Sequence, residues 1–468
     1  MQISISKTNK FLMVLTLLCG SFITAFSETL LNNGLPTIMR EVHVNEMTVQ
    51  WLSTGYMLAA GITMPLAAYF TNSIKLKTLF TTTMSIFLAG TILSAVATNF
   101  PLLLIGRLIE GIAVGINMPL IPNVLSLVFS PQHRGTVMGV TGIIINFGPA
   151  IGPIISGIIV DHYSWRMLFI ILIPISILVI IASQIFVKNI IPTQQLKLDL
   201  LSVMSSFIGL GLLLYGLGRI GQTGHLDVFT ITILAIGIGL TTYFVKRQFK
   251  LTTPLLEMRV FKAPSYRLGV ILALVSTASV MSAELMLPLF NQNVLKVSPT
   301  TSALIMLPSA IAMIIISPIA GRLYDQIGIR LVGFVGLGLG LVTSIPMTGY
   351  TTATSFFIIS ILYAIRCGGL NLAYPPISVY ALNALPQRYV VFGNTIMVTL
   401  SQVASAFANA MAATAQALGQ KQGITHHLPL DVARLQGFHW SFWAITALNI
   451  IAFVFLLRVK NRSSVEIK

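Results

Sequence analysis

Charged side chains are scarce in this chain of 468 residues. Asp, Glu, Lys and Arg together make up 9% of it, whereas hydrophobic residues make up 55% and the mean hydropathy is +0.88. A typical soluble domain carries about 25% charged residues, so the composition excludes an ordinary soluble protein and predicts an integral membrane protein. The formal net charge of +16 does not indicate nucleic-acid binding, because the basic residues lie in short segments between apolar runs.

Cysteine and catalytic motifs are also sparse. Cys19 and Cys367 both lie inside apolar runs, which favours small core residues over a disulfide or a metal site. The sequence contains no P-loop, no His-Glu-x-x-His motif and no nucleophile elbow. We therefore expect neither an enzyme nor a receptor, with no cofactor and no metal. ATP could drive transport only through a separate ATPase subunit.

Long apolar runs dominate instead. About 20 apolar residues cross a bilayer as a helix, and by this criterion the chain is an all-α membrane protein with 14 transmembrane helices. Residues 7–26 could also be a signal peptide, but the run continues past Glu28 and further runs follow, so we expect the first span to be retained. The expected spans are 11–34, 50–70, 78–97, 101–121, 136–160, 167–187, 200–219, 228–246, 267–290, 301–320, 331–349, 355–378, 394–416 and 438–457.

The basic residues predict the orientation of these spans. Cytoplasmic loops are enriched in Lys and Arg, and most of them fall on one side if both termini are cytoplasmic. The longest outer loop is then expected at 417–437, where His426 and His427 are interpreted as solvated rather than metal-binding. We expect a multi-pass protein of the cell membrane. The basic residues left outside are Arg40, Arg166, Arg219, Lys296, Lys421 and Arg434.

One short pattern occurs twice, at 65–77 and at 318–330. Each copy has a Pro near the end of an apolar run, then Asn72 or Asp325, then Lys77 or Arg330 before the next run. Each copy reads as a tight hairpin between two spans, and such parallel repeats are typical of transporters built from two related halves.

The repeat predicts the domain organisation. Residues 1–190 form an N-terminal six-helix bundle, and residues 263–468 form a C-terminal six-helix bundle. Residues 191–262 hold an inserted transmembrane helix pair and a basic cytoplasmic loop.

Glycine and proline are concentrated in the fifth expected span, which contains Gly148, Pro149 and Gly152. Pro breaks backbone hydrogen bonding in a membrane helix unless the freed groups face protein or water, whereas small residues allow helices to pack closely. The segment is either a tightly packed helix or a bend that shapes a central cavity, and we favour the bend.

Five charged residues lie within the expected spans: Glu28, Arg107, Glu110, Glu284 and Arg366. A lone charge at the middle of the bilayer costs about 2.5 to 3.5 kcal/mol even on the mildest scale. Such residues are therefore candidates for proton coupling or for contact with a charged substrate.

Glu28 and Glu284 occupy near-equivalent places in the two halves. Glu28 precedes the hairpin Pro65 by 37 residues, and Glu284 precedes Pro318 by 34. An acid that takes up a proton on one side of the membrane and releases it on the other is what proton coupling requires. We interpret both as proton carriers or as charges that meet a cationic substrate; the alternative is a hydrogen bond between helices.

Arg107 and Glu110 are three residues apart and therefore share one face of a helix. They form either an internal ion pair or a switch, in which Arg107 releases a carboxylate when a proton or substrate moves.

Taken together, these motifs resemble the major facilitator superfamily, and within it the fourteen-span drug:proton antiporter family. The second hairpin, from Gly321 to Arg330, looks like the superfamily loop signature, while the first has Asn72 where Asp is usual. Residues 103–113 are similar to the fourth-span motif, and residues 148–152 resemble the antiporter motif. Ser27-Glu28-Thr29, Trp165-Arg166 and residues 287–292 are also family-like.

The resemblance implies a major facilitator fold, two six-helix bundles plus an inserted helix pair. It implies export and assigns an antiporter motif to Gly148, Pro149 and Gly152. Asparagines of the expected substrate cavity are Asn32, Asn146 and Asn291. The expected gating loops contain Gly321, Arg322, Asp325, Gly328, Arg330, Asn72 and Lys77.

The sequence thus predicts a proton-coupled multidrug efflux transporter that exports hydrophobic or cationic drugs, driven by the proton gradient. A proton-coupled exporter or permease for a single metabolite or lipid-like solute is the alternative. The expected cavity lining is mostly Met, Phe, Asn, Ser and Thr, which favours broad apolar binding. Its expected partners are small substrates, protons and the bilayer, and we expect a monomer.

Overall fold

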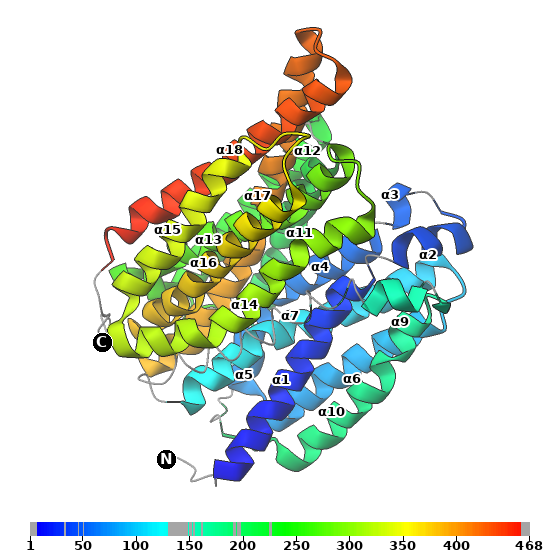
Figure 1. Ribbon diagram of the computed structural model, residues 1–468. Coiled ribbons are helices and arrows are strands. Elements are labelled where there is room, and N and C mark those ends of the chain that lie inside the picture. Colours follow the sequence, from blue (N-terminus) through cyan, green and yellow to red (C-terminus); the bar gives the residue numbers. More distant parts are fainter. Residues whose placement is uncertain are drawn as a thin grey trace.

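The computed structural model describes residues 7–31, 34–44, 46–49, 51–129, 148, 152, 155–160, 162–190, 193, 198–223 and 227–459. These residues form helices joined by short connections, and none of them lies in a β-strand. Twelve of the helices are long and apolar enough to cross a membrane. Figure 1 shows them as a bundle in which α1 begins near the bottom of the view and α18 ends at its left side.

The N-terminal part contains five long or paired elements that correspond to expected spans. Its second expected span is broken at Pro65, because proline cannot donate the backbone hydrogen bond that would continue the helix. The elements are α1 (Lys7–Leu30), α2 (Leu35–Glu41), α3 (Glu46–Val49), α4 (Trp51–Thr63), α5 (Leu66–Ser73), α6 (Leu76–Ala95), α7 (Phe100–Val128), α9 (Met167–Ile170) and α10 (Leu172–Phe186).

The remaining helices cover the expected inserted pair and the C-terminal part. They are α11 (Leu200–Thr223), α12 (Val228–Lys250), the 3₁₀ helix η3 (Met258–Lys262), α13 (Pro264–Asn293), α14 (Pro299–Ile327), α15 (Ile329–Met347), α16 (Phe356–Asn383), α17 (Gln387–Thr425) and α18 (Leu430–Leu456).

Fourteen spans were expected, and the structure has twelve spanning candidates among its described residues. The two expected spans missing from the twelve are 50–70, which is divided between α4 and α5, and 136–160, most of which lies outside the described residues.

The repeated pattern forms two tight connections, as its spacing predicts. α5 ends at Ser73 and α6 begins at Leu76, while α14 and α15 are separated only by Gly328. Gly328 has φ 80°, a conformation that favours glycine. We call the side of the bundle that carries these two connections the hairpin side.

The prediction that residues 417–437 form an outer loop is wrong. α17 continues to Thr425 and α18 begins at Leu430, so most of this segment is helical and projects beyond the bundle (Figure 1). The polar residues suggested a loop, but glycines let the two helices pack closely: a Cβ at Gly437 would lie 2.4 Å from the carbonyl oxygen of Gln416. His426 and His427 lie in the turn at its tip.

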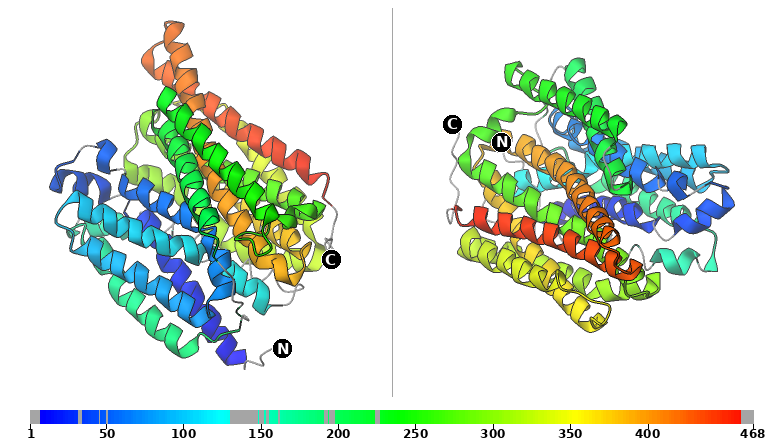
Figure 2. Two further views of the ribbon diagram at one scale, coloured as in Figure 1. Left: turned by 180° about the vertical axis from the view of Figure 1, so that it is seen from behind. Right: turned by 90° about the horizontal axis from the view of Figure 1, so that it is seen from above.

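α11 packs against α4 and also against α17. The pair α11 and α12 therefore lies along helices of both the N-terminal and the C-terminal parts, as the green helices of Figure 2 show.

Candidate functional site

The guanidinium of Arg107 lies at the meeting point of three helices. It is fully buried on α7 and forms an ion pair of 2.5 Å with Glu110, one turn further along. Its Nη1 atom also donates to Ser27 Oγ of α1 at 3.0 Å, and its Nε atom donates to the Leu52 carbonyl of α4 at 3.4 Å. The structure thus contains the ion pair, one of the two alternatives that the spacing of three residues left open, while the switch stays a prediction.

An aromatic ring covers the other face of this arginine. The guanidinium carbon lies 4.0 Å from the centre of the Tyr56 ring, and the Tyr56 hydroxyl donates to the Thr24 carbonyl of α1 at 2.9 Å. Within the described residues, Arg107 Nη2 is buried without a hydrogen-bond partner. The cluster therefore joins α1, α4 and α7 and keeps one donor available to a new acceptor.

Glu28 and Glu284 interact electrostatically with each other although they come from opposite ends of the chain. Glu28 is half-buried on α1 and also interacts with Arg107, while Glu284 on α13 is exposed and acts on Tyr363 of α16. The helices that carry the two acids, α1 and α13, belong to the N-terminal and C-terminal parts of the chain. The electrostatic interaction of the two acids therefore crosses between these parts.

Arg366 is the second buried arginine, and neutral groups surround it. Its Nε atom donates to Ser344 Oγ at 3.0 Å, and its Nη2 atom donates to Ser279 Oγ at 2.6 Å. Asn449 links these two serines, because it accepts from Ser279 and donates to Ser344, each at 2.7 Å. Among the described residues no carboxylate forms an ion pair with Arg366, so its charge is held by dipoles of α13, α15 and α18.

Amide side chains connect the two parts of the molecule on the hairpin side. Asn394 of α17 donates to Asn123 Oδ1 of α7 at 2.8 Å and to the Pro119 carbonyl at 3.3 Å. Asn123 donates in turn to Thr395 Oγ1 at 3.3 Å. We call Asn123, Asn394 and Thr395 the amide contact. Sequence reasoning missed it, because neutral amides more than 270 positions apart give no signal of charge or spacing.

A family model described as Major Facilitator Superfamily matches residues 17–409. This chain belongs to the Major Facilitator Superfamily. It is 34% identical to the uncharacterized MFS-type transporter YcnB of Bacillus subtilis (strain 168), over 97% of this chain and 96% of that protein. It is 33% identical to the lincomycin resistance protein LmrB of the same organism, over 87% of this chain and 85% of that protein.

Among solved structures, the fold is similar to that of the proton:xylose symporter XylE bound to 6-bromo-6-deoxy-D-glucose. The TM-score is 0.67 over 98% of both chains, at 14% sequence identity. As a facilitator-superfamily member the chain is a multi-pass membrane transporter, not an enzyme, and it needs no cofactor.

The two hairpins that were expected to act as gating loops differ in their contacts. In the first, Asn72 donates to the Ala68 carbonyl of its own helix at 2.9 Å, and Lys77 Nζ donates to the Gln184 carbonyl of α10 at 2.5 Å. In the second, Gly321 is buried, whereas Arg322 and Arg330 are exposed. The roles of these residues, with Asp325 and Gly328, stay predictions.

The two glycines of the expected antiporter motif, Gly148 and Gly152, pack against α1. A Cβ at Gly152 would lie 2.2 Å from Thr29 Oγ1, and one at Gly148 would lie 3.0 Å from the Phe26 backbone nitrogen. Only glycine therefore allows this close approach beside Glu28. Pro149, like the cavity candidates Asn32 and Asn146, lies outside the described residues.

Asn291, the third cavity candidate, is fully buried on α13. Its amide donates to Ser302 Oγ of α14 at 3.3 Å. In this structure the side chain joins two helices, and its contact with a substrate stays a prediction.

Glu41 anchors the segment that follows α1 at the side opposite the hairpins. Its carboxylate accepts from Trp165 Nε1 at 2.6 Å and from Arg166 Nη1, and Arg166 Nη2 also donates to the Ala97 carbonyl at 3.1 Å. The hydrogen bond from Arg166 is the main reason that the pKa of Glu41 is lowered. The family-like Trp165-Arg166 pair thus has a structural role.

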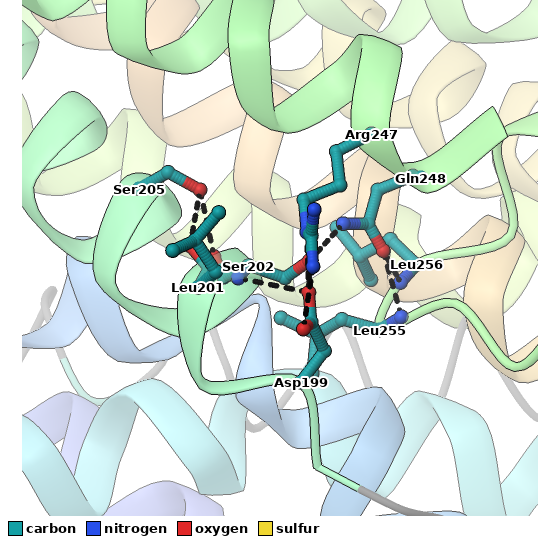
Figure 3. Close-up of polar contacts among 8 residues, drawn as sticks. All are labelled: Asp199, Leu201, Ser202, Ser205, Arg247, Gln248, Leu255 and Leu256. Carbon is teal, nitrogen blue, oxygen red and sulfur yellow. Dashed lines mark hydrogen bonds and ion pairs between the residues drawn. The ribbon is translucent and has the colours of Figure 1, made fainter. Parts of the chain in front are cut away.

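Figure 3 shows the polar network at the hairpin-side end of α11 and α12. Asp199 binds Arg247 through two hydrogen bonds of 2.7 and 2.9 Å, which hold the pKa of Asp199 far below its usual range. Gln248 donates to Ser202 Oγ at 2.7 Å and accepts from the Leu255 backbone at 2.7 Å. The network fixes the helix pair to the segment that leads into α13.

Proposed function

We propose that this protein is a proton-coupled multidrug efflux transporter, which exports hydrophobic or cationic compounds by alternating access. The observation that carries the proposal is the buried cluster in which Arg107 pairs with Glu110 and donates to Ser27, the residue before Glu28, while its Nη2 atom has no hydrogen-bond partner among the described residues. A carboxyl group in surroundings poor in water favours its neutral, protonated form, and a nearby arginine favours the ionised form. The proton on Glu28 thus depends on what occupies the space beside it.

A cationic substrate in this space competes with protons for the same carboxylates. Binding of the cation favours ionised acids and so releases protons, while proton uptake from the opposite side releases the cation. Arg107 holds Glu110 in either case, and its unpartnered Nη2 atom offers Glu28 a donor when that acid ionises.

Two acids matter for the energetics of cation export. A proton entering the cell yields about 2.3 kcal/mol per 100 mV of membrane potential, plus about 1.4 kcal/mol per pH unit. Export of one positive charge consumes the electrical part, so a single proton leaves only the pH term. Two carboxylates, one on α1 and one on α13, permit two protons and a larger substrate gradient.

The relatives support export of drugs rather than of one metabolite, since LmrB is named a lincomycin resistance protein. The alternative is an exporter or permease for a single metabolite or lipid-like solute. A resistance profile across unrelated dyes and antibiotics, measured with and without a proton ionophore, separates the two. Protection against several unrelated compounds that the ionophore abolishes supports the proposal, while protection against one compound, or protection that survives the ionophore, contradicts it.

We further propose fourteen spans with both termini in the cytoplasm of the cell. α4 and α5 together extend over residues 51–73, about 33 Å at 1.5 Å per residue, which is enough to cross the hydrocarbon core as one bent span. The segment expected at 136–160 supplies the other span. In this arrangement 1–190 and 263–468 are the two bundles, and 191–262 is the insertion.

A further inference from the structure

A groove of about 460 Å³ lies on the hairpin side of the C-terminal helices, where α15 begins and α18 ends. It is lined by Ile327, Arg330, Leu331, Phe334, Leu456 and Leu457. None of these residues belongs to the proposed transport site, which involves other faces of the bundle.

Small residues on α15 create the floor of this groove. α15 and α18 pack closely at Gly333, where a Cβ would lie 2.8 Å from Leu456 Cδ1. The next residue of α15, Phe334, lines the groove, and its ring lies 5.2 Å from that of Phe453 on α18. The contact between these two rings closes the groove on one side.

The walls of the groove are open to the bilayer. Leu331, Phe334 and Leu457 expose 57%, 50% and 63% of their surface. They lie near the hairpin-side ends of α15 and α18. In a membrane protein the apolar material that can cover such exposed side chains is the acyl chain of a lipid.

The mouth of the groove is positively charged. Arg330 is exposed, and among the described residues no hydrogen-bond acceptor or carboxylate pairs with it. Arg458, next to Leu457, is also exposed and contacts only the ring of Phe455, at 5.7 Å, within the described part of the chain. Arg330 lies in the first turn of α15, whose N-cap Gly328 makes no side-chain capping hydrogen bond, so the first backbone N–H groups of this helix lack a side-chain cap.

We propose that this groove binds an anionic phospholipid. Its phosphodiester accepts hydrogen bonds from Arg330 and from the first turn of α15, as arginines and helix starts bind phosphates elsewhere. One acyl chain lies along Leu331, Phe334 and Leu457. The lipid would hold together α14, α15 and α18 on the hairpin side, beside the second gating connection.

The test is native mass spectrometry of the full chain in detergent, titrated with phosphatidylglycerol, phosphatidylcholine and glycerol 3-phosphate. The variant Arg330→Gln removes the proposed phosphate ligand. Leu457→Trp fills the groove without changing the charge. Arg388→Gln is the matched control, because Arg388 is an exposed arginine on the hairpin side that does not line the groove.

We expect wild type to bind phosphatidylglycerol more tightly than phosphatidylcholine. Arg330→Gln should weaken phosphatidylglycerol binding about fivefold, because each basic residue contributes roughly 1 kcal/mol to the attraction of an anionic lipid. Leu457→Trp should also weaken this binding. Arg388→Gln should bind phosphatidylglycerol as tightly as wild type does. Equal weakening by Arg388→Gln would mean unspecific attraction and would overturn the site. Displacement by glycerol 3-phosphate would show a site for free phosphate esters. A large gain of lipid binding after deletion of residues 460–468 would show that the chain's own tail is the occupant.

Discussion

At the scale of single residues, the cluster around Arg107 concentrates more charge in the membrane than any other group of described residues. Its ion pair with Glu110 is fully buried, and Ser27, Leu52 and Tyr56 each contact the guanidinium. Buried ion pairs add little net stability compared with apolar residues of similar size, but each charge depends on its partner.

Arg107→Met should therefore destabilise the folded protein by about 3 to 5 kcal/mol, because it leaves the Glu110 carboxylate buried without a counter-charge. The double variant Arg107→Met with Glu110→Met removes both charges and should recover most of this loss. Unfolding of the purified variants in detergent measures both effects. A double variant as unstable as the single one would mean that packing of Arg107, rather than its charge, is what matters.

Glu41 gives a residue-scale test that depends on pH. Its pKa is lowered in the folded protein by the hydrogen bond from Arg166, so its contribution to stability is present above the pKa of the unfolded chain and is lost as pH falls through the lower folded pKa. The difference in melting temperature between wild type and Glu41→Gln should shrink on acidification from pH 7 into this range. A difference that stays constant down to the acid range would contradict the role of the Glu41 carboxylate.

At the scale of elements, apolar length predicts helices better than it predicts their ends. α6 ends at Ala95, close to the end of the span expected at 78–97. In contrast, α17 extends beyond its expected span of 394–416 to Thr425, although its last turns carry Gln, Lys and Thr. Hydropathy could not predict this extension, because close packing of α17 and α18 at Gly419 and Gly437 stabilises it. Burial of apolar side chains in a bilayer is not what holds these turns in place. The break at Pro65, in contrast, follows from a single residue.

The amide contact between α7 and α17 makes an element-scale prediction about conformation. Asn394→Ala removes two hydrogen bonds that join the two parts of the molecule, at about 0.5 to 1.5 kcal/mol each, and should shift the equilibrium away from the closed hairpin side by roughly tenfold or more. Spin labels at the hairpin-side ends of α7 and α17 should report longer distances in this variant.

Asn371→Ala is the matched control for this experiment. Asn371 donates to the Met313 carbonyl and to Ser317 Oγ, both on α14 of the same part of the molecule as α16. Its loss should leave the distances between α7 and α17 unchanged. Identical distances in wild type and Asn394→Ala would show that the amide contact does not hold this side closed.

At the scale of the whole molecule, the family match confirms the resemblance to the Major Facilitator Superfamily. The two related parts that the duplicated hairpin predicts stay a prediction. The five charged residues within the spans could be found from the sequence because charges are so rare there. Their arrangement could not, since the interaction of Glu28 with Glu284 joins positions 256 apart (284 − 28). Arg366 was expected to take part in proton coupling or in contact with a charged substrate, which stays a prediction, and in the structure its side chain donates to two serines.

Coupling at this scale requires that protons and substrate compete for acids located between the two parts. If either carboxylate were only a structural hydrogen-bond acceptor, its amide analogue would preserve both transport and coupling. Transport driven by a pH gradient, measured in the amide variants, therefore distinguishes acids that carry protons from acids with a structural role.

The most direct test is uptake of a cationic dye into inside-out proteoliposomes, driven by an imposed pH gradient. Wild type and the surface control Asp431→Asn, whose carboxylate is 74% exposed, should accumulate dye, while Glu28→Gln, which keeps only one of the two proposed proton carriers, should accumulate much less. Accumulation by Glu28→Gln at the wild-type level would contradict the account.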